Sequence, residues 1–104
     1  MRAIWIGSAV GMLLAGAAVA AHPGQETFDK SCKTCHGAQG QGNPAMAKVL
    51  KVTMRQLGAK EVQAKTDDQL REDIAKGTGK MKPVAGLSKK QVDDLVGLIR
   101  TLKQ

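Results

Sequence analysis

The sequence predicts a small all-α protein, and three observations support this prediction. Two segments begin with the pattern of a helical capping box, Thr66-Asp67-Asp68-Gln69 and Ser88-Lys89-Lys90-Gln91. The second of them leads into apolar residues at helical spacing that continue to the end of the chain. No stretch alternates apolar and polar residues with the period of two that marks a half-buried strand. The length of 104 residues fits one small domain and excludes a multidomain enzyme.

Residues 1–20 have the composition of a secretory signal sequence. Arg2 provides a short positive start, and an uncharged, mostly apolar run follows it. The run ends at Ala18-Val19-Ala20, a small-residue cleavage pattern, although cleavage after Ala21 fits as well. The alternative is a single membrane anchor, because the run approaches the roughly 18 apolar residues that span a bilayer. The small-residue end favours the signal sequence, so we expect an exported mature domain of residues 21–104.

A first helix is expected around the two cysteines of the chain, over residues 26–35. Phe28, Cys32 and Cys35 recur at positions i, i+4 and i+7, which places them on one helix face. Residues 37–44 contain three glycines and a proline, and these residue types interrupt regular structure. This stretch is therefore predicted to form a loop directly after the cysteine pair.

The second half of the chain contains two clearer helices. Residues 45–57 hold one helical turn of apolar residues, and their structure stays ambiguous, although Gly58 is expected to end whatever element forms there. A helix starts after Thr66 and stops at Gly77, since glycine is the usual residue just beyond a helix C-terminus. Residues 78–86, with two glycines and a proline, form a second predicted loop. The last helix follows Ser88 and presents an apolar stripe of Val92, Leu95, Val96, Ile99 and Leu102.

The segment Cys32-Lys33-Thr34-Cys35-His36 contains the most specific chemistry of the sequence. Two cysteines three residues apart on a helix project to the same side, and the following histidine stays close to both. With this spacing, two thiols can add to the two vinyl groups of a haem while the imidazole lies beneath the iron. C-x-x-C-H is the attachment signal of c-type haem. We therefore predict one covalent haem c on Cys32 and Cys35, with His36 as an axial iron ligand.

Three other uses of a cysteine pair fit the chain less well. A structural zinc site needs four ligands, and the only other histidine, His22, lies in the irregular start of the mature domain. A thioredoxin-like redox pair expects strands around it, which the sequence does not predict. A disulfide between Cys32 and Cys35 closes so few residues that it adds little stability. Haem attachment is therefore the preferred interpretation.

Together with this motif, several other positions resemble the small monohaem cytochromes c of bacteria. The resemblance covers essentially all of residues 21–104, and it is most specific at the attachment motif and at a downstream methionine followed by a proline. The positions that carry it are Gly24, Phe28, Cys32, Cys35, His36, Gly37, Gly40, Gly42, Pro44, Gly77, Gly79, Met81, Pro83, Leu87 and Ser88. It implies the small cytochrome c fold, in which three to four helices wrap around one covalently bound haem, and a periplasmic location.

The resemblance also implies a methionine as the second axial ligand, on the side of the iron opposite His36. Met81 is the candidate, because it lies in a glycine-flanked loop between two predicted helices. Such a loop can present a side chain to a cleft while the helices hold the loop in place. Pro83 stiffens the backbone just beyond the methionine.

Other side chains compete for this position in principle. Met46 and Met54 stand among apolar residues, so they are expected to fill the core. His22 is the alternative ligand, but it would need the N-terminal segment to fold over the haem. Lys80 or Lys82 could replace the methionine at alkaline pH, as happens in relatives.

The resemblance assigns supporting roles to two further residues. The Pro44 carbonyl is expected to accept a hydrogen bond from Nδ1 of His36, which would fix the imidazole and raise its basicity. The alternative is that Pro44 merely begins a turn. Phe28 is expected to pack against the last helix near Gly97 and Leu98.

The predicted ligand set indicates the function. A neutral methionine sulfur favours Fe(II), and iron with six ligands has no open position for oxygen or peroxide. Both properties favour an electron carrier over an enzyme. The expected function is that of a soluble periplasmic cytochrome that carries one electron at a time through Fe(III)/Fe(II) haem. The alternative is a dedicated electron-transfer subunit of a periplasmic oxidoreductase complex.

The net charge of +7 bears on the partners. A basic surface steers encounters with acidic docking surfaces of redox proteins, although an ordinary solvated surface is the alternative explanation. The lysines expected around the haem are Lys30, Lys33, Lys48, Lys51, Lys80, Lys82, Lys89 and Lys90. The scarcity of aromatic residues argues against a nucleic-acid partner. We expect a monomer without stable membrane insertion after processing.

Overall fold

The computed structural model describes residues 21–104 together with Ala3, Gly7 and Gly11, and it confirms the predicted all-α class. The helices of this part of the chain are α1 (Gln25–Ser31), α2 (Lys33–His36), α3 (Pro44–Leu50), α4 (Lys60–Gln63), α5 (Asp67–Lys76) and α6 (Lys89–Thr101). Two of them, α2 and α4, are single turns of four residues. The other four helices of this part of the chain agree with the three to four helices that the family resemblance implies. No strand occurs among the described residues, where Thr78 and Met81 form one isolated bridge.

The predicted signal sequence, residues 1–20, lies outside the described residues except for the three isolated positions named above. The continuous part of the structure begins at Ala21, next to the two predicted cleavage positions. Within the described part of the chain, every helix is too short or too polar to cross a membrane.

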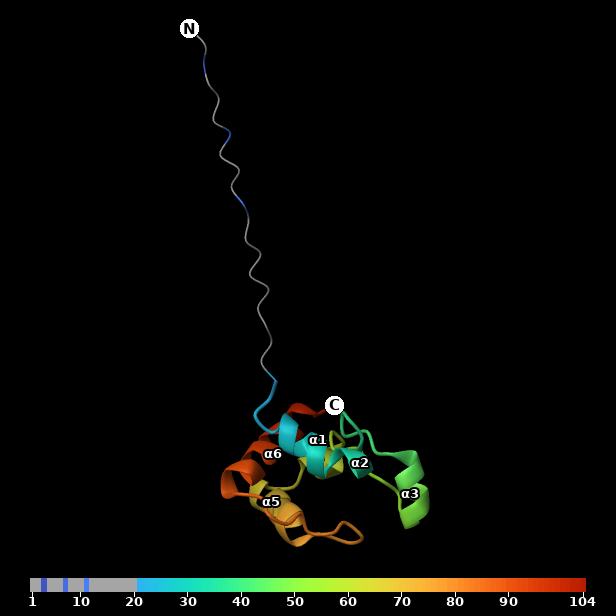
Figure 1. Cartoon of the computed structure of the whole chain (residues 1–104). Coiled ribbons are helices and arrows are strands. Elements are labelled where there is room, and N and C mark those ends of the chain that lie inside the picture. Colours follow the sequence, from blue (N-terminus) through green and yellow to red (C-terminus); the bar gives the residue numbers. More distant parts are fainter. Residues whose placement is uncertain (1–2, 4–6, 8–10, 12–20) are drawn as a thin grey trace.

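Helix α6 is the element on which the other long helices assemble. It packs against both α5 and α1, whereas the main helix contact of α3 is with the short helix α2. Figure 1 shows α6 beside α1 and α5, with α3 on the opposite side of the molecule. The approach of α1 to α6 is very close at Gly24, where a Cβ atom would lie 2.5 Å from the carbonyl oxygen of Asp94. Any side chain at Gly24 would therefore push the two helices apart.

The apolar core lies between α1, α5 and α6. Phe28 and Leu95 are its most completely buried large side chains. The other buried apolar residues are Val62, Leu70, Ile74, Val96, Leu98 and Ile99. Phe28 belongs to the same cluster as Leu98, which agrees with the predicted packing of this aromatic ring on the last helix.

Both predicted capping boxes form. The side chain of Thr66 accepts a hydrogen bond from the backbone N–H of Gln69 at 3.1 Å, and the Gln69 side chain accepts one from the Thr66 N–H at 2.8 Å. Ser88 and Gln91 make the same pair of bonds at 3.1 and 2.8 Å. Each box satisfies two backbone donors that a helix start otherwise leaves without partners, so α5 and α6 begin where the sequence predicts.

The ambiguous segment 45–57 is helical only in its first part. Pro44 is the first residue of α3, and the Asn43 side chain caps the helix by accepting from the N–H groups of residues 45 and 46. The helix ends at Lys51, which adopts the left-handed conformation with φ 54°. A lysine is an uncommon residue for this conformation, and for that reason the sequence contains no recognisable stop signal there.

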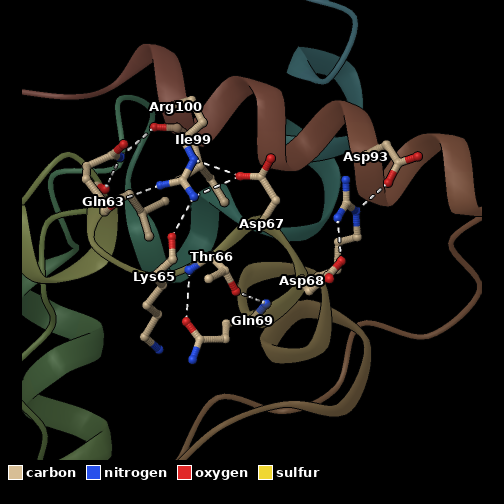
Figure 2. Close-up of polar contacts among 11 residues, drawn as sticks. Gln63, Lys65, Thr66, Asp67, Asp68, Gln69, Asp93, Ile99 and Arg100 are labelled. Atoms are coloured by element: carbon tan, nitrogen blue, oxygen red, sulfur yellow. Dashed lines mark hydrogen bonds and ion pairs between the residues drawn. The ribbon is translucent and has the colours of Figure 1, made fainter.

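Arg100 of α6 joins the last helix to the link between α4 and α5 (Figure 2). Its Nη1 donates to the carbonyl of Gln63 at 2.8 Å, and its Nη2 donates to the carbonyl of Lys65 at 2.6 Å. Nε and Nη2 also donate to the Asp67 carboxylate at 3.0 and 2.8 Å. Gln63 in turn donates to the carbonyl of Ile99 at 2.9 Å. One guanidinium therefore holds three successive points of a segment that has few buried side chains of its own.

We predict that Arg100→Lys lowers the free energy of unfolding of the holoprotein by about 1–3 kcal/mol, because a lysine cannot reproduce the fork of donors. Urea denaturation followed by far-UV circular dichroism measures this change. Arg71→Lys is the matched control, since Arg71 bonds only the carboxylates of Asp68 and Asp93 and reaches no backbone carbonyl. Its loss should be clearly smaller. Equal losses in the two variants would contradict the special role of Arg100.

Candidate functional site

Two adjoining cavities open beside the cysteine pair. The smaller measures about 150 Å³ and is walled mostly by side chains of the apolar core. The larger measures about 900 Å³ and opens between α3 and residues 78–85. The residues that line both are Cys32, His36, Arg55, Lys65, Thr78 and Met81. Because they share these walls, the cavities form one hollow of the size that proteins use for small ligands and cofactors.

The junction of α1 and α2 places the cysteines and the histidine on one wall of the hollow. The Cys32 N–H donates to the carbonyl of Phe28 at 2.8 Å, which ends α1, and the His36 N–H donates to the Cys32 carbonyl at 2.9 Å. The continuous helix predicted over residues 26–35 is thus interrupted at Cys32. Cys32, Cys35 and His36 nevertheless all line the larger cavity, as the predicted common face requires.

The loop after His36 folds back and holds the end of α2. The N–H of Gly42 donates to the His36 carbonyl at 2.7 Å, and the N–H of Asn43 donates to the Cys35 carbonyl at 2.9 Å. The Asn43 side chain adds a bond to the Thr34 carbonyl at 3.0 Å. These three bonds satisfy carbonyls that a helix end leaves open. They hold the His36 backbone from the C-terminal side.

His36 is half-buried, and the Nδ1 atom of its imidazole is buried without a hydrogen-bond partner. Its Nδ1 makes no hydrogen bond within the described part of the chain. The predicted bond to the carbonyl of Pro44 is therefore absent from this structure, in which Pro44 is exposed at the start of α3. Burial lowers the pKa of His36 below its ordinary value. The neutral imidazole, which is the form that binds a metal, is thus favoured.

The chemistry of the cysteine pair favours modification over thiol redox activity. Burial, followed by the proximity of Cys35, raises the pKa of Cys32 to about 11, so the thiol is protonated at neutral pH. A redox cysteine needs the opposite shift, toward a stable thiolate. No disulfide joins Cys32 to Cys35. The described residues contain no group of three or more histidine, cysteine or acidic side chains that could hold a zinc ion.

Met81 lines the same hollow as Cys32 and His36, but it comes from a different segment of the chain. It lies in the loop between α5 and α6, where its N–H donates to the Thr78 carbonyl at 2.9 Å and its carbonyl accepts from the Thr78 N–H at 3.1 Å. Its side chain is half-buried and lines both cavities together with His36. The structure thus brings the two predicted iron ligands, far apart in the sequence, to one hollow.

The competing ligands are placed differently. His22 lines neither cavity, because its Nδ1 accepts a bond from the N–H of Gly24 at 3.0 Å and its ring lies against Gly97 of α6. The expectation that Met46 and Met54 fill the core is wrong. Both are half-buried, lie outside the core cluster and line the larger cavity, Met46 from α3, which has no buried residue, and Met54 from the irregular segment after it.

Sequence reasoning missed the charged residues of the hollow. Arg55 and Lys65 line both cavities, and Lys65 pairs with Asp73 through an Nζ–Oδ2 distance of 2.6 Å. Arg55 lies in the segment with the ambiguous pattern, and Lys65 lies just before a capping box. No local motif marks either residue, because their position depends on how distant segments pack.

Comparison with known proteins decides the family. The cytochrome c family profile matches residues 21–103, which is nearly the whole described domain. The chain belongs to the cytochrome c family. This cytochrome is 35% identical over 85 residues to cytochrome c-554(547) of Halothiobacillus neapolitanus, which covers 77% of this chain and 93% of that protein. A solved structure, the KustC0563 c-type cytochrome, aligns with a TM-score of 0.67 and 31% identity over 78% of this chain and 98% of that one.

The cytochrome c family transfers electrons through a covalently attached haem c, and the residues of this cytochrome fit that cofactor. The hollow is mostly apolar, as a porphyrin face requires. It is lined by two free thiols for attachment, by a neutral imidazole with an unpaired nitrogen and by a thioether sulfur. Nitrogen and soft sulfur donors are the axial ligands that haem iron accepts in cytochromes c.

The lowered pKa of His36 predicts a pH dependence of stability. In the unfolded chain the imidazole takes up a proton near its ordinary pKa of 6.5, whereas burial lowers the pKa of the folded protein's imidazole, so it takes up the proton only at lower pH. The free energy of unfolding should therefore fall as the pH drops from about 6.5 to about 5, above the range of ordinary carboxyl groups. Urea denaturation of the holoprotein over this pH range measures the fall. His22→Gln should show the same fall, and loss of the effect in that variant would assign it to His22 instead.

Proposed function

We propose that this cytochrome is a periplasmic carrier that moves one electron at a time, with haem held by thioether bonds to Cys32 and Cys35 and with His36 and Met81 as the axial ligands. The observation that supports this proposal is that His36 and Met81 line the same two cavities from separate segments. When bound, the haem supplies a one-electron couple between Fe(III) and Fe(II). The residues around the hollow would provide the iron ligands and exclude water from the haem.

Each ligand has a defined task in this proposal. His36 enters as the neutral imidazole, which burial already favours. Met81 supplies a neutral, soft sulfur that favours Fe(II) and raises the reduction potential. Occupation of both axial positions supports a carrier and not an enzyme.

The location and the assembly state complete the proposal. Residues 1–20 act as a signal sequence that is cleaved after Ala20 or Ala21, and residues 21–104 form the mature domain in the periplasm. This domain acts as a monomer that meets its redox partners by diffusion. A dedicated subunit of a periplasmic oxidoreductase complex is the alternative, and gel filtration of a native extract distinguishes it from a free carrier.

The axial assignment is tested by Met81→Ala. We expect the variant to keep its covalent haem but to lose the weak red absorbance band of a methionine–Fe(III) bond. Its reduction potential should fall, because the ligand that favours Fe(II) is gone. Absorbance spectra and redox titration measure both changes. Met54→Ala is the control, since Met54 also lines the larger cavity but should leave the band unchanged. If the band survives in Met81→Ala and disappears in Met54→Ala, then Met54 and not Met81 is the iron ligand.

The charge distribution supports docking to acidic partners at the opening of the larger cavity. Its lining contains four cations and no acidic residue, namely Arg55, Lys65, Lys80 and Lys82. No ion pair within the described residues involves Arg55, Lys80 or Lys82. By contrast, Lys76 and Lys90 on α5 and α6 pair with Glu72 and Asp94 at 3.3 and 2.7 Å. Part of the uncompensated positive charge therefore lies on the side where the hollow opens.

We predict that Lys80→Gln/Lys82→Gln slows electron exchange with an anionic oxidant such as hexacyanoferrate(III) by about threefold to tenfold at low salt. The difference from the wild type should shrink near 0.15 M salt, where charges are screened beyond about 8 Å. Stopped-flow absorbance measures the rates, and a retained red band shows that the haem ligands are intact. Lys76→Gln/Lys90→Gln removes the same charge elsewhere and should change the rate little. Equal slowing in both double variants would show that only net charge matters.

A further inference from the structure

The loop that presents Met81 begins at a glycine in an unusual conformation. Gly77 ends α5, and its N–H donates to the Asp73 carbonyl at 3.0 Å. The sequence predicts a glycine just beyond the end of the helix, a position at which glycine commonly adopts the left-handed conformation. The structure instead has φ 78° and ψ 166°, in a region of backbone space that is essentially limited to glycine. The chain therefore leaves α5 extended and turns back toward it within a few residues.

The returning chain passes directly against Gly77. A Cβ atom on this residue would lie 2.5 Å from the carbonyl oxygen of Met81, 2.9 Å from the backbone nitrogen of Pro83 and 3.0 Å from its Cδ. Real Cβ atoms do not approach other heavy atoms as closely as the first two of these distances. The obstructing atoms belong to the backbone and to a proline ring, so they cannot swing aside as the end of a flexible side chain could.

The same segment is also held by backbone hydrogen bonds. Thr78 and Met81 bond each other in both directions at 2.9 and 3.1 Å, and the N–H of Val84 donates to the Ile74 carbonyl at 2.9 Å. Residues 81–84 are thus fixed to the end of α5 on both sides of Pro83. A side chain at Gly77 would have to displace this segment as a unit, and the Met81 sulfur would move with it.

We propose that Gly77 is the positioning residue for the second axial ligand: its missing side chain lets residues 81–83 lie against α5 and thereby sets the reach of the Met81 sulfur into the hollow. The proposal rests on the assignment of Met81 as a ligand. Ligands must be held within about half an ångström of their productive position, and Gly77 acts on that position through the Met81 carbonyl that it contacts.

The chain contains a control for the positive φ of Gly77. Gly86, at the other end of the same loop, has the same φ of 78°, but a Cβ there would meet nothing within 4 Å. Gly86 also lines neither cavity. Alanine at Gly86 therefore introduces an unfavourable φ without the collision, whereas alanine at Gly77 introduces both.

The experiment compares the holoproteins of wild type, Gly77→Ala and Gly86→Ala. We expect Gly77→Ala to lose the red methionine–Fe(III) band, to show a lower reduction potential and, when reduced, to bind carbon monoxide rapidly at pH 7. Gly86→Ala should keep the band and the potential of the wild type, even where its midpoint of unfolding by urea is lowered. A structural role alone would lower the unfolding midpoint in both variants and leave the band in both.

Three results would overturn the proposal, and they differ from one another. If Gly77→Ala keeps the band and the potential, Gly77 does not position the ligand, while the Met81 assignment stands. If Gly77→Ala forms no holoprotein while Gly86→Ala does, the role of Gly77 is structural. If the wild type itself lacks the band, the Met81 assignment fails, and the positioning role fails with it.

Discussion

The structure depends on one constraint, namely that the same apolar side chains form both the core and the wall of the hollow. Phe28, Leu70, Ile74, Leu95 and Ile99 are buried and also line the smaller cavity. A chain with so few aromatic residues has little further apolar surface to close this space. A covalently attached haem c supplies that surface, so the cofactor of this cytochrome completes the packing between α1, α5 and α6. Function and stability are coupled because the two share these residues.

The elements that do not pack in the core are held by polar contacts and by close backbone approaches. Arg100 fixes the link between α4 and α5, and the same bonds set the position of Lys65 at the cavity wall. Gly24 lets α1 approach α6, and Gly77 lets the ligand loop return to α5. Both glycines allow backbone to lie where a side chain would otherwise stand. In a domain of this size, a few specific contacts at the helix ends therefore fix the positions of the segments that do not pack in the core.

The sequence predicts the parts of this structure that are encoded locally. Capping boxes at Thr66 and Ser88 are complete within four residues, and the attachment motif at Cys32 lies on a single turn, so each is recognisable without knowledge of the fold. Other features depend on tertiary packing and leave no local signal. This second group includes the end of α3 before Lys51 and the position of Arg55 in the hollow. It also includes the collision that a side chain at residue 77 would cause. The pattern around Met46 and Met54 misled because apolar residues that contact a cofactor and residues that fill a core have the same composition.

The distribution of charge follows from the same division of the molecule. On α5 and α6, whose packing forms the core, cations such as Lys76 and Lys90 are neutralised by carboxylates one helical turn away. At the opening of the hollow, Lys80 and Lys82 have no such partner among the described residues. Pairing these lysines would bring carboxylates beside the ligand loop, where a negative charge would stabilise Fe(III) and oppose the preference of a methionine sulfur for Fe(II). If Met81 binds the iron as proposed, leaving these lysines unpaired avoids that conflict. The same two lysines would then serve both the reduction potential and the proposed encounter with an acidic partner.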